Sequence, residues 1–166
     1  MLSKATEYAI RALVYIHLQN KKGKKPGYRE IAKETESPEH FTAKVLQTLT
    51  RHQLINSARG KGGGFFFDPK TKELKVYEVI KTMEGESFFS KCIFGFRFCD
   101  SHFPCPLHDD FMKIWEDFKK LAETKSIQDL ANKIEDQQAF LIRPQTNEEN
   151  PDSISGIQTS IPSSAS

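Results

Sequence analysis

The sequence is poor in hydrophobic residues, which form 37% of its 166 positions. This share is below that of an ordinary globular protein, so we expect part of the chain to join no core. No stretch approaches the run of about 18 apolar residues that a membrane-spanning helix needs, and the start has no apolar secretory signal. These absences predict a soluble cytoplasmic protein of one domain with an extension and no membrane partner.

Motifs typical of enzymes are also missing. The sequence has no phosphate-binding glycine loop, no paired carboxylates and no Ser, His and Asp order that would predict catalysis. We therefore expect that the protein is not an enzyme.

Cysteine is scarce, and its distribution is uneven. The three cysteines, Cys92, Cys99 and Cys105, all lie in one short stretch. An odd number without a secretory signal argues against a disulfide framework. Three clustered thiols instead indicate a metal site or a redox sensor.

The spacing of these cysteines, completed by His108, is C-x6-C-x5-C-x2-H. Thiolates bind soft metals and iron–sulfur clusters, and imidazole can complete the ligand set. The gaps are wider than the C-x2-C pairs of structural zinc sites, so they fit a loop around a larger cluster better. Zinc bound by three cysteines and a histidine, and thiols that act as a redox switch without metal, stay open as alternatives. Lys91 and Arg97 flank the loop, and we expect them to lower the pKa of nearby thiols.

Charge is divided between the two halves of the chain. Residues 1–75 hold 15 Lys and Arg against 7 Asp and Glu, a net of +8, whereas residues 76–166 hold 9 against 15, a net of −6. A basic first half indicates a polyanionic partner, with nucleic acid as the main hypothesis and a solvated basic face as the alternative.

Two helices are predicted at the start of the chain. Apolar residues at helical spacing, with Ser3 as the cap, predict a helix from Ser3 to about residue 18. A polar break with glycine and proline, residues 20–27, is expected not to pack. A second short helix follows over residues 28–35.

The sequence Ser37-Pro38-Glu39 predicts the start of a third helix, which runs to about residue 52. Ser37 would supply the cap oxygen, and Pro38 would take the first helical position. Its expected buried residues are Phe41, Val45, Leu46 and Leu49. Two short helices joined by a tight turn are typical of a helix-turn-helix.

A β-hairpin, or wing, is predicted directly after this helix pair. Residues 54–58 and 64–67 have the composition of two strands, and their connection is rich in glycine, which permits positive φ and close backbone approach. Arg59 at the tip suits the narrow, electronegative minor groove of DNA. A plain hairpin without a DNA contact is the alternative.

The second half of the chain is predicted to hold a sensor loop and a long helix. A short helix over residues 76–83 precedes an irregular stretch that ends near Pro106. From Leu107, apolar residues recur every three or four positions, which predicts a wide apolar face for a partner chain or for the same chain's core. We therefore expect four regions: a winged helix-turn-helix (1–83), a sensor loop (84–108), a dimerisation helix and a closing helix that starts at Ser126 (109–142), and a disordered tail (143–166).

Taken in order, these motifs resemble the Rrf-type winged-helix transcriptional regulators, the family of the iron–sulfur cluster regulator IscR and the nitric-oxide-sensing repressor NsrR. The resemblance covers about residues 1–135 and rests on Thr6-Glu7-Tyr8-Ala9-Ile10-Arg11-Ala12-Leu13, on the wing Arg59-Gly60-Lys61-Gly62-Gly63-Gly64 and on the three cysteines. It implies a mainly α fold with a small β-hairpin wing and a homodimer that binds a roughly palindromic operator in double-stranded DNA.

Roles for individual residues also come from the resemblance. DNA contacts are implied for Tyr28, Pro38, His40, Lys44, Arg51, Arg59, Gly60 and Lys61. Dimer contacts are implied for Phe111, Ile114, Trp115, Phe118 and Leu121. In the family the cluster is the sensor. IscR-like members place a histidine just after the third cysteine and bind [2Fe–2S], as His108 would allow, whereas NsrR-like members bind [4Fe–4S] with an acidic residue from the partner's first helix, where Glu7 stands here. We favour [2Fe–2S] with His108.

Overall fold

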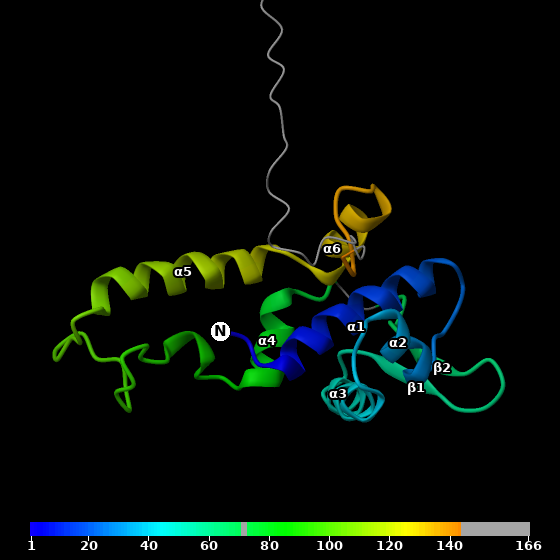
Figure 1. The fold of residues 1–166 in the computed structure, drawn as a ribbon, viewed down its shortest axis with the longest axis horizontal. Helices are drawn as coiled ribbons and strands as arrows, with labels where there is room; N and C mark the ends of the chain where they lie inside the picture. The colour runs from blue at the N-terminus through cyan, green and yellow to red at the C-terminus, as the bar shows by residue number, and fades with distance from the viewer. Residues whose placement is uncertain (71–72, 144–166) are drawn as a thin grey trace, which may run out of the picture.

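The computed structural model describes residues 1–70 and 73–143, and it confirms a mainly α fold with one small hairpin (Figure 1). Its elements are α1 (Lys4–Lys21), α2 (Tyr28–Glu34), α3 (Glu39–Arg51), β1 (Asn56–Ala58), β2 (Gly64–Phe66), α4 (Val76–Glu84), the 3-10 helix η1 (Phe88–Ser90), α5 (His108–Thr124) and α6 (Ile127–Glu135). Apart from Arg143, the tail predicted to be disordered lies outside the described residues. Over the described ranges, every helix is too short or too polar to cross a membrane.

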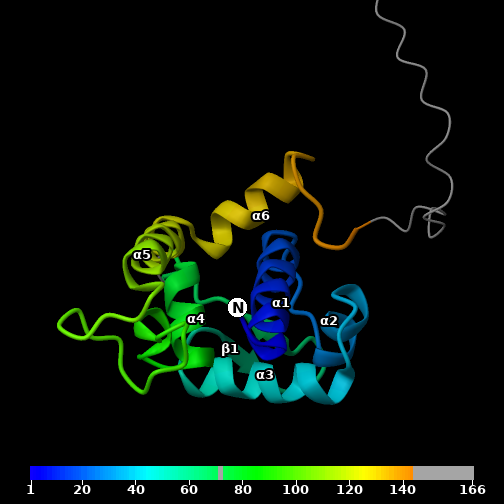
Figure 2. The same cartoon turned by 60° about the vertical axis from the view of Figure 1, so that its left-hand side comes forward.

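Helix α1 is the centre of the fold. It contacts α2, α3, α4, α6 and β2, and Figure 2 shows it between α3 on one side and α6 on the other. Ser3 caps its start as predicted, because its hydroxyl oxygen accepts a hydrogen bond from the Thr6 N–H at 3.3 Å. The helix ends at Lys21, later than expected, since Gly23 at φ +73° makes the turn that stops it.

The start of α3 differs from the prediction. Ser37 does not cap the helix, because its hydroxyl group is engaged with the hydroxyl groups of Thr35 (2.8 Å) and Thr42 (2.7 Å). Pro38 has extended backbone angles and takes the cap position, so the helix begins at Glu39. The helix pair and its tight turn are nevertheless present, as a helix-turn-helix requires.

The buried face of α3 also differs in one residue. Val45, Leu46 and Leu49 are buried as predicted, but Phe41 is 47% exposed. Thr42 is buried in its place, because positions 42, 45, 46 and 49 form one helical stripe and position 41 lies beside it.

The wing is fastened to the turn between α1 and α2. Strands β1 and β2 pair antiparallel with Asn56 opposite Phe66, and the Phe65 N–H donates to the Pro26 carbonyl at 2.9 Å. Asn20 adds a side-chain bond, since its Oδ1 accepts from the Phe67 N–H at 2.9 Å. Pro26 is buried. The expectation that residues 20–27 pack against nothing was therefore wrong.

A second, smaller core lies beneath α5. Buried Ile80, Phe88 and Ala122 pack with half-buried Trp115 and Phe118, so α5 rests on α4 and η1. Helix η1 was not predicted; it lies in the stretch read as irregular. In Figure 1, α5 leads from this core to the cysteine-bearing loop, which lies at the opposite end of the molecule from the wing.

Candidate functional site

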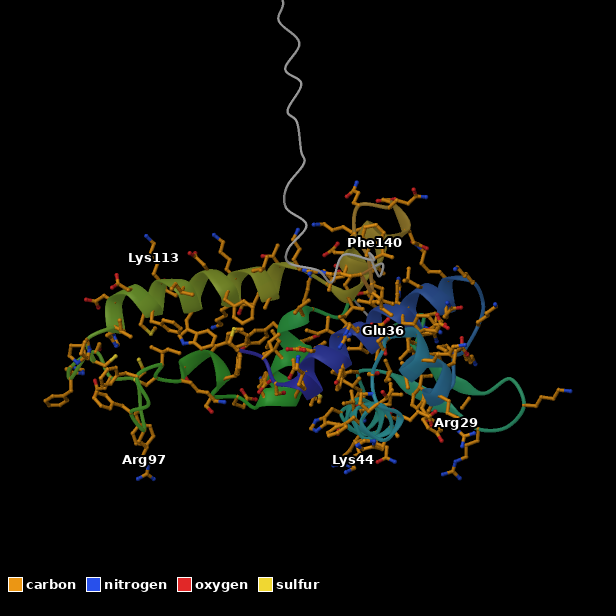
Figure 3. The ribbon with its side chains drawn as sticks, in the orientation of Figure 1. Arg29, Glu36, Lys44, Arg97, Lys113 and Phe140 are labelled. Atoms are coloured by element: carbon orange, nitrogen blue, oxygen red, sulfur yellow. The ribbon has the colours of Figure 1, made fainter. Side chains whose placement is uncertain are left out.

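Three candidate DNA-contact side chains, His40, Lys44 and Arg51, lie on α3 opposite its buried stripe, and all are exposed. Figure 3 shows Lys44 pointing away from the body of the protein. Tyr28, at the start of α2, is 37% exposed. An exposed, basic face on the second helix of a helix-turn-helix is suited to the major groove.

The wing tip presents two more cations, Arg59 and Lys61, both exposed. Gly60 and Gly62 have φ of +86° and +78°, a left-handed backbone conformation that glycine adopts easily. In the part of the chain that the structure describes, neither cation forms an ion pair with an acidic side chain. Their charge is available to an external anion.

The three cysteines and His108, which belong to one short stretch of the sequence, line one pocket. Cys105 is buried, at 8% exposure, and the other two cysteines are half-buried. The remaining walls are mostly apolar: Lys91, Ile93, Leu107, Phe111, Met112 and Trp115. The pocket therefore combines soft donors with a shielding hydrophobic wall.

Within this pocket, Cys99 is the cysteine closest to the histidine. Its Sγ atom lies 3.4 Å from His108 Nδ1 and 3.8 Å from the Met112 sulfur. His102 is fully outside the group, because its ring pairs with Asp100 at 3.1 Å and points to solvent. Among residues 1–70 and 73–143, no three His, Cys, Asp or Glu side chains are arranged to hold a single metal ion.

The pKa of the Cys92 thiol lies below its ordinary value, although not for the reason predicted. Burial raises this pKa, but hydrogen bonds from the backbone of Phe96, Phe94 and Gly95 and from the Cys105 thiol together lower it by more. The flanking cations Lys91 and Arg97 are not among its main causes. The pKa of Cys99 is raised, first by burial and then by the two neighbouring thiols.

Glu7, the alternative fourth ligand, lies in the first turn of α1 and pairs with Lys4 at 2.8 Å. It does not line the cysteine pocket of its own chain. Glu7 could therefore serve as a ligand at that pocket only from a partner subunit.

The apolar face of α5 is divided in two. Phe111, Trp115 and Phe118 are half-buried, whereas Ile114 and Leu121 are 56% and 54% exposed. Trp115 packs inside its own chain: its indole N–H donates to the Lys91 carbonyl at 3.2 Å. This bond from α5 to the start of the loop was missed, because nothing local in the sequence pairs residues so far apart.

These features match a known family along most of the chain. The family model that matches is that of Rrf2, described as an iron-dependent transcriptional regulator, and it covers residues 2–133. The chain belongs to the Rrf2 family of transcriptional regulators. Membership confirms the predicted resemblance, and the regulator names of the family's members support a protein that is not an enzyme.

Two bacterial relatives are similar over almost their whole length. The chain is 31% identical to Protein aau3 of Rhizobium meliloti, over 88% of this chain and 97% of the relative. It is 26% identical to the HTH-type transcriptional regulator NsrR of Oceanobacillus iheyensis, over 84% of this chain and 95% of the relative.

Solved structures share the fold of this Rrf2-family chain. The global cysteine regulator CymR of B. subtilis matches with a TM-score of 0.66 at 17% identity, over 80% of this chain and 96% of CymR. T. potens IscR matches with a TM-score of 0.64 at 18% identity, over 84% of this chain and 92% of IscR. At these identities the likeness shows the winged-helix fold alone.

Proposed function

We propose that this Rrf2-family regulator is a cytoplasmic homodimer that binds a roughly palindromic DNA operator and senses redox, nitric oxide or iron–sulfur status through a cluster. The observation that carries the proposal is the convergence of Cys92, Cys99, Cys105 and His108 on one pocket. Relatives named NsrR and IscR support a sensing role for this family.

The donor set fits an iron–sulfur cluster. Thiolates are the usual ligands of such clusters, and an imidazole can replace a thiolate on one iron. Cys99 and His108 lie side by side, and Cys92 and Cys105 line the same pocket. Three thiols with one imidazole match the ligands of a [2Fe–2S] cluster, which we favour over [4Fe–4S]. Glu7 of a partner subunit is the alternative fourth ligand.

A bound cluster would supply the redox-active and nitric-oxide-reactive group of the sensor. This chain's own residues hold it and limit its exposure, because Phe111, Met112 and Trp115 form the wall on the α5 side of the pocket. Since the same wall belongs to α5, a change at the thiols acts on the helix that we assign to the dimer contact.

DNA binding is assigned to the exposed face of α3 and to the wing. Lys44 and His40 would reach base edges in the major groove, Arg59 would enter the minor groove, and Tyr28, Pro38, Arg51, Gly60 and Lys61 would lie against the backbone. The excess of positive charge in residues 1–75 supports this assignment.

The dimer contact is assigned to one stripe of α5. Leu107, Phe111, Ile114, Phe118 and Leu121 alternate by four and three positions, which is the spacing of a coiled-coil seam. Leu107, Ile114 and Leu121 are about half exposed in the single chain, so a partner has apolar surface to cover. Trp115 lies off this stripe, and we assign it to the internal core instead.

The sensor is tested by visible and Mössbauer spectroscopy of protein expressed with iron and purified without oxygen. We expect the signature of a [2Fe–2S] centre with one imidazole ligand. A [4Fe–4S] signature would move the fourth ligand to Glu7. Protein that contains zinc, or that stays colourless after reconstitution, would contradict the cluster sensor.

The second candidate is a regulator of the same fold whose thiols act as a switch. The pocket that the three thiols share favours it, because two thiols of one pocket, such as Cys92 and Cys105, can be oxidised to a disulfide by a peroxide. The peroxide takes two electrons and two protons and is reduced to water and an alcohol or to two waters. Colourless protein whose Cys92 and Cys105 form a disulfide on peroxide treatment would support this candidate.

A further inference from the structure

We infer that the cysteine loop is itself part of the DNA-binding surface, with Arg97 as a contact to the phosphate backbone. This inference rests on the proposed DNA-binding function and extends it. Neither the helix-turn-helix nor the wing contains Arg97, and the proposed contacts described above end with residue 61.

The first argument is the side of the molecule to which Arg97 points. In Figure 3, the labelled side chains of Arg97, Lys44 and Arg29 project toward the same lower edge, although they come from the loop, α3 and α2. Lys113, on α5, projects toward the opposite edge. A duplex that lies against α3 therefore runs along the side to which Arg97 also points.

The second argument is the state of the Arg97 side chain. Arg97 is exposed, and no acidic side chain of the described ranges pairs with it. Its guanidinium carbon lies 5.3 Å from the centroid of the Phe98 ring, which is itself 72% exposed. The ring supports one face of the guanidinium group and leaves its N–H donors free, and such a planar fork matches the oxygens of a phosphate.

The third argument is the connection between Arg97 and the cysteines. Arg97 lies in the segment between Cys92 and Cys99, so both ends of that segment are cluster ligands in our proposal. Near its start, the Gly95 N–H donates to the Cys92 carbonyl at 3.2 Å, with Gly95 at φ +90°. The Phe94 and Phe96 rings then pack edge to face, with their centroids 5.3 Å apart. A change in what Cys92 and Cys99 bind would therefore displace the Arg97 contact directly.

The experiment measures the salt dependence of DNA binding. The probe is a duplex that the wild-type protein selects from a random-sequence pool, long enough for two half-sites. For Arg97→Gln, we expect binding about tenfold weaker and a slope of log K against log salt that is lower by about one per protomer. Arg97→Lys keeps the charge and should keep the slope. Lys113→Gln, on the opposite side, should match the wild type.

The outcomes separate this inference from the function on which it rests. If Arg59→Gln weakens binding while Arg97→Gln behaves as Lys113→Gln does, the loop contact is wrong and the proposed DNA binding stands. If Arg97→Lys loses as much slope as Arg97→Gln, the residue acts through loop shape, and the phosphate contact is again wrong. If the wild-type protein selects no duplex, both the inference and the DNA-binding function fail.

Discussion

The Sγ atom of Cys99 lies 3.4 Å from Nδ1 of His108, at the point where the loop returns to the start of α5. This contact predicts that the two residues act on the same iron. We expect Cys99→Ala to remove visible absorbance from a protein that still folds. His108→Ala should shift the spectrum or destabilise the centre, while His102→Ala, its solvent-facing control, should leave it unchanged. Colour retained in Cys99→Ala would mean another ligand set.

The wing predicts a second result, which concerns affinity for DNA. Arg59→Ala removes a cation from an exposed tip, so operator binding should weaken and the salt slope should fall by about one per protomer. Fluorescence anisotropy at several salt concentrations measures both. Lys120→Ala, on the exposed surface of α5, is the matched control. Equal DNA affinity and salt slope in the two variants would show that the wing does not contact DNA.

The exposed stripe of α5 predicts the effect of one charge on assembly. Ile114→Glu would bury an unpaired carboxylate between two subunits, and we expect dimer association to weaken by roughly a hundredfold. Lys113→Glu, one residue away and outside this stripe, should not change it. Sedimentation equilibrium distinguishes the two, and an unchanged dimer in Ile114→Glu would show that this stripe is not the contact.

A carboxylate at the end of α4 predicts a pH dependence of stability. Burial raises the pKa of Glu84, but hydrogen bonds from the Thr6 hydroxyl and the Ser3 N–H lower it more, so its folded pKa lies below the ordinary value. A lowered folded pKa stabilises the protein above the unfolded pKa of about 4.3, and this contribution is lost as pH falls through the folded pKa.

Glu84→Gln should therefore cost about 1–2 kcal/mol of unfolding free energy at pH 7, and the difference from wild type should shrink toward pH 3. Urea denaturation across this range measures it. Glu86→Gln, which disrupts an exposed pair with Lys81, should cost little at any pH. A loss in Glu84→Gln that is independent of pH would mean that the carboxylate charge is not involved.

The attachment of the wing predicts that alanine at two glycine positions lowers the free energy of unfolding by different amounts. A Cβ at Gly64 would lie 2.1 Å from the Lys25 carbonyl oxygen, whereas a Cβ at Gly60 would meet nothing within 4 Å. Both positions have positive φ, so Gly60→Ala should cost about 1 kcal/mol. Gly64→Ala should cost at least about 2–3 kcal/mol, because backbone must move. Equal costs in urea denaturation would show that the wing does not depend on this contact.

Local sequence patterns predict much of the fold. Ser126 caps the last helix, α6: its hydroxyl accepts from the Asp129 N–H at 3.0 Å, while the Asp129 carboxylate accepts from the Ser126 N–H at 2.8 Å. A serine followed by an acid in the first turn predicted this cap. Ser37 shows the limit of such signals. Serine is a common cap residue, but the Ser37 hydroxyl group forms hydrogen bonds with the hydroxyl groups of Thr35 and Thr42 instead.

The cysteine pocket was predictable in membership but not in shape. Spacing alone identified Cys92, Cys99, Cys105 and His108 as one donor set. Their arrangement around the pocket depends on contacts between segments distant in the chain, such as the bond from Trp115 on α5 to the Lys91 carbonyl. Such contacts follow from tertiary packing, which residue spacing does not encode.

Trp115 gives the protein an optical reporter of its own. It is the single tryptophan of the sequence, and its indole ring lies on the wall of the cysteine pocket. All indole emission therefore comes from one position beside the thiols. Loading, loss or oxidation at the pocket would change the intensity of that emission, and the fluorescence of the unlabelled protein can follow the sensor while DNA is bound.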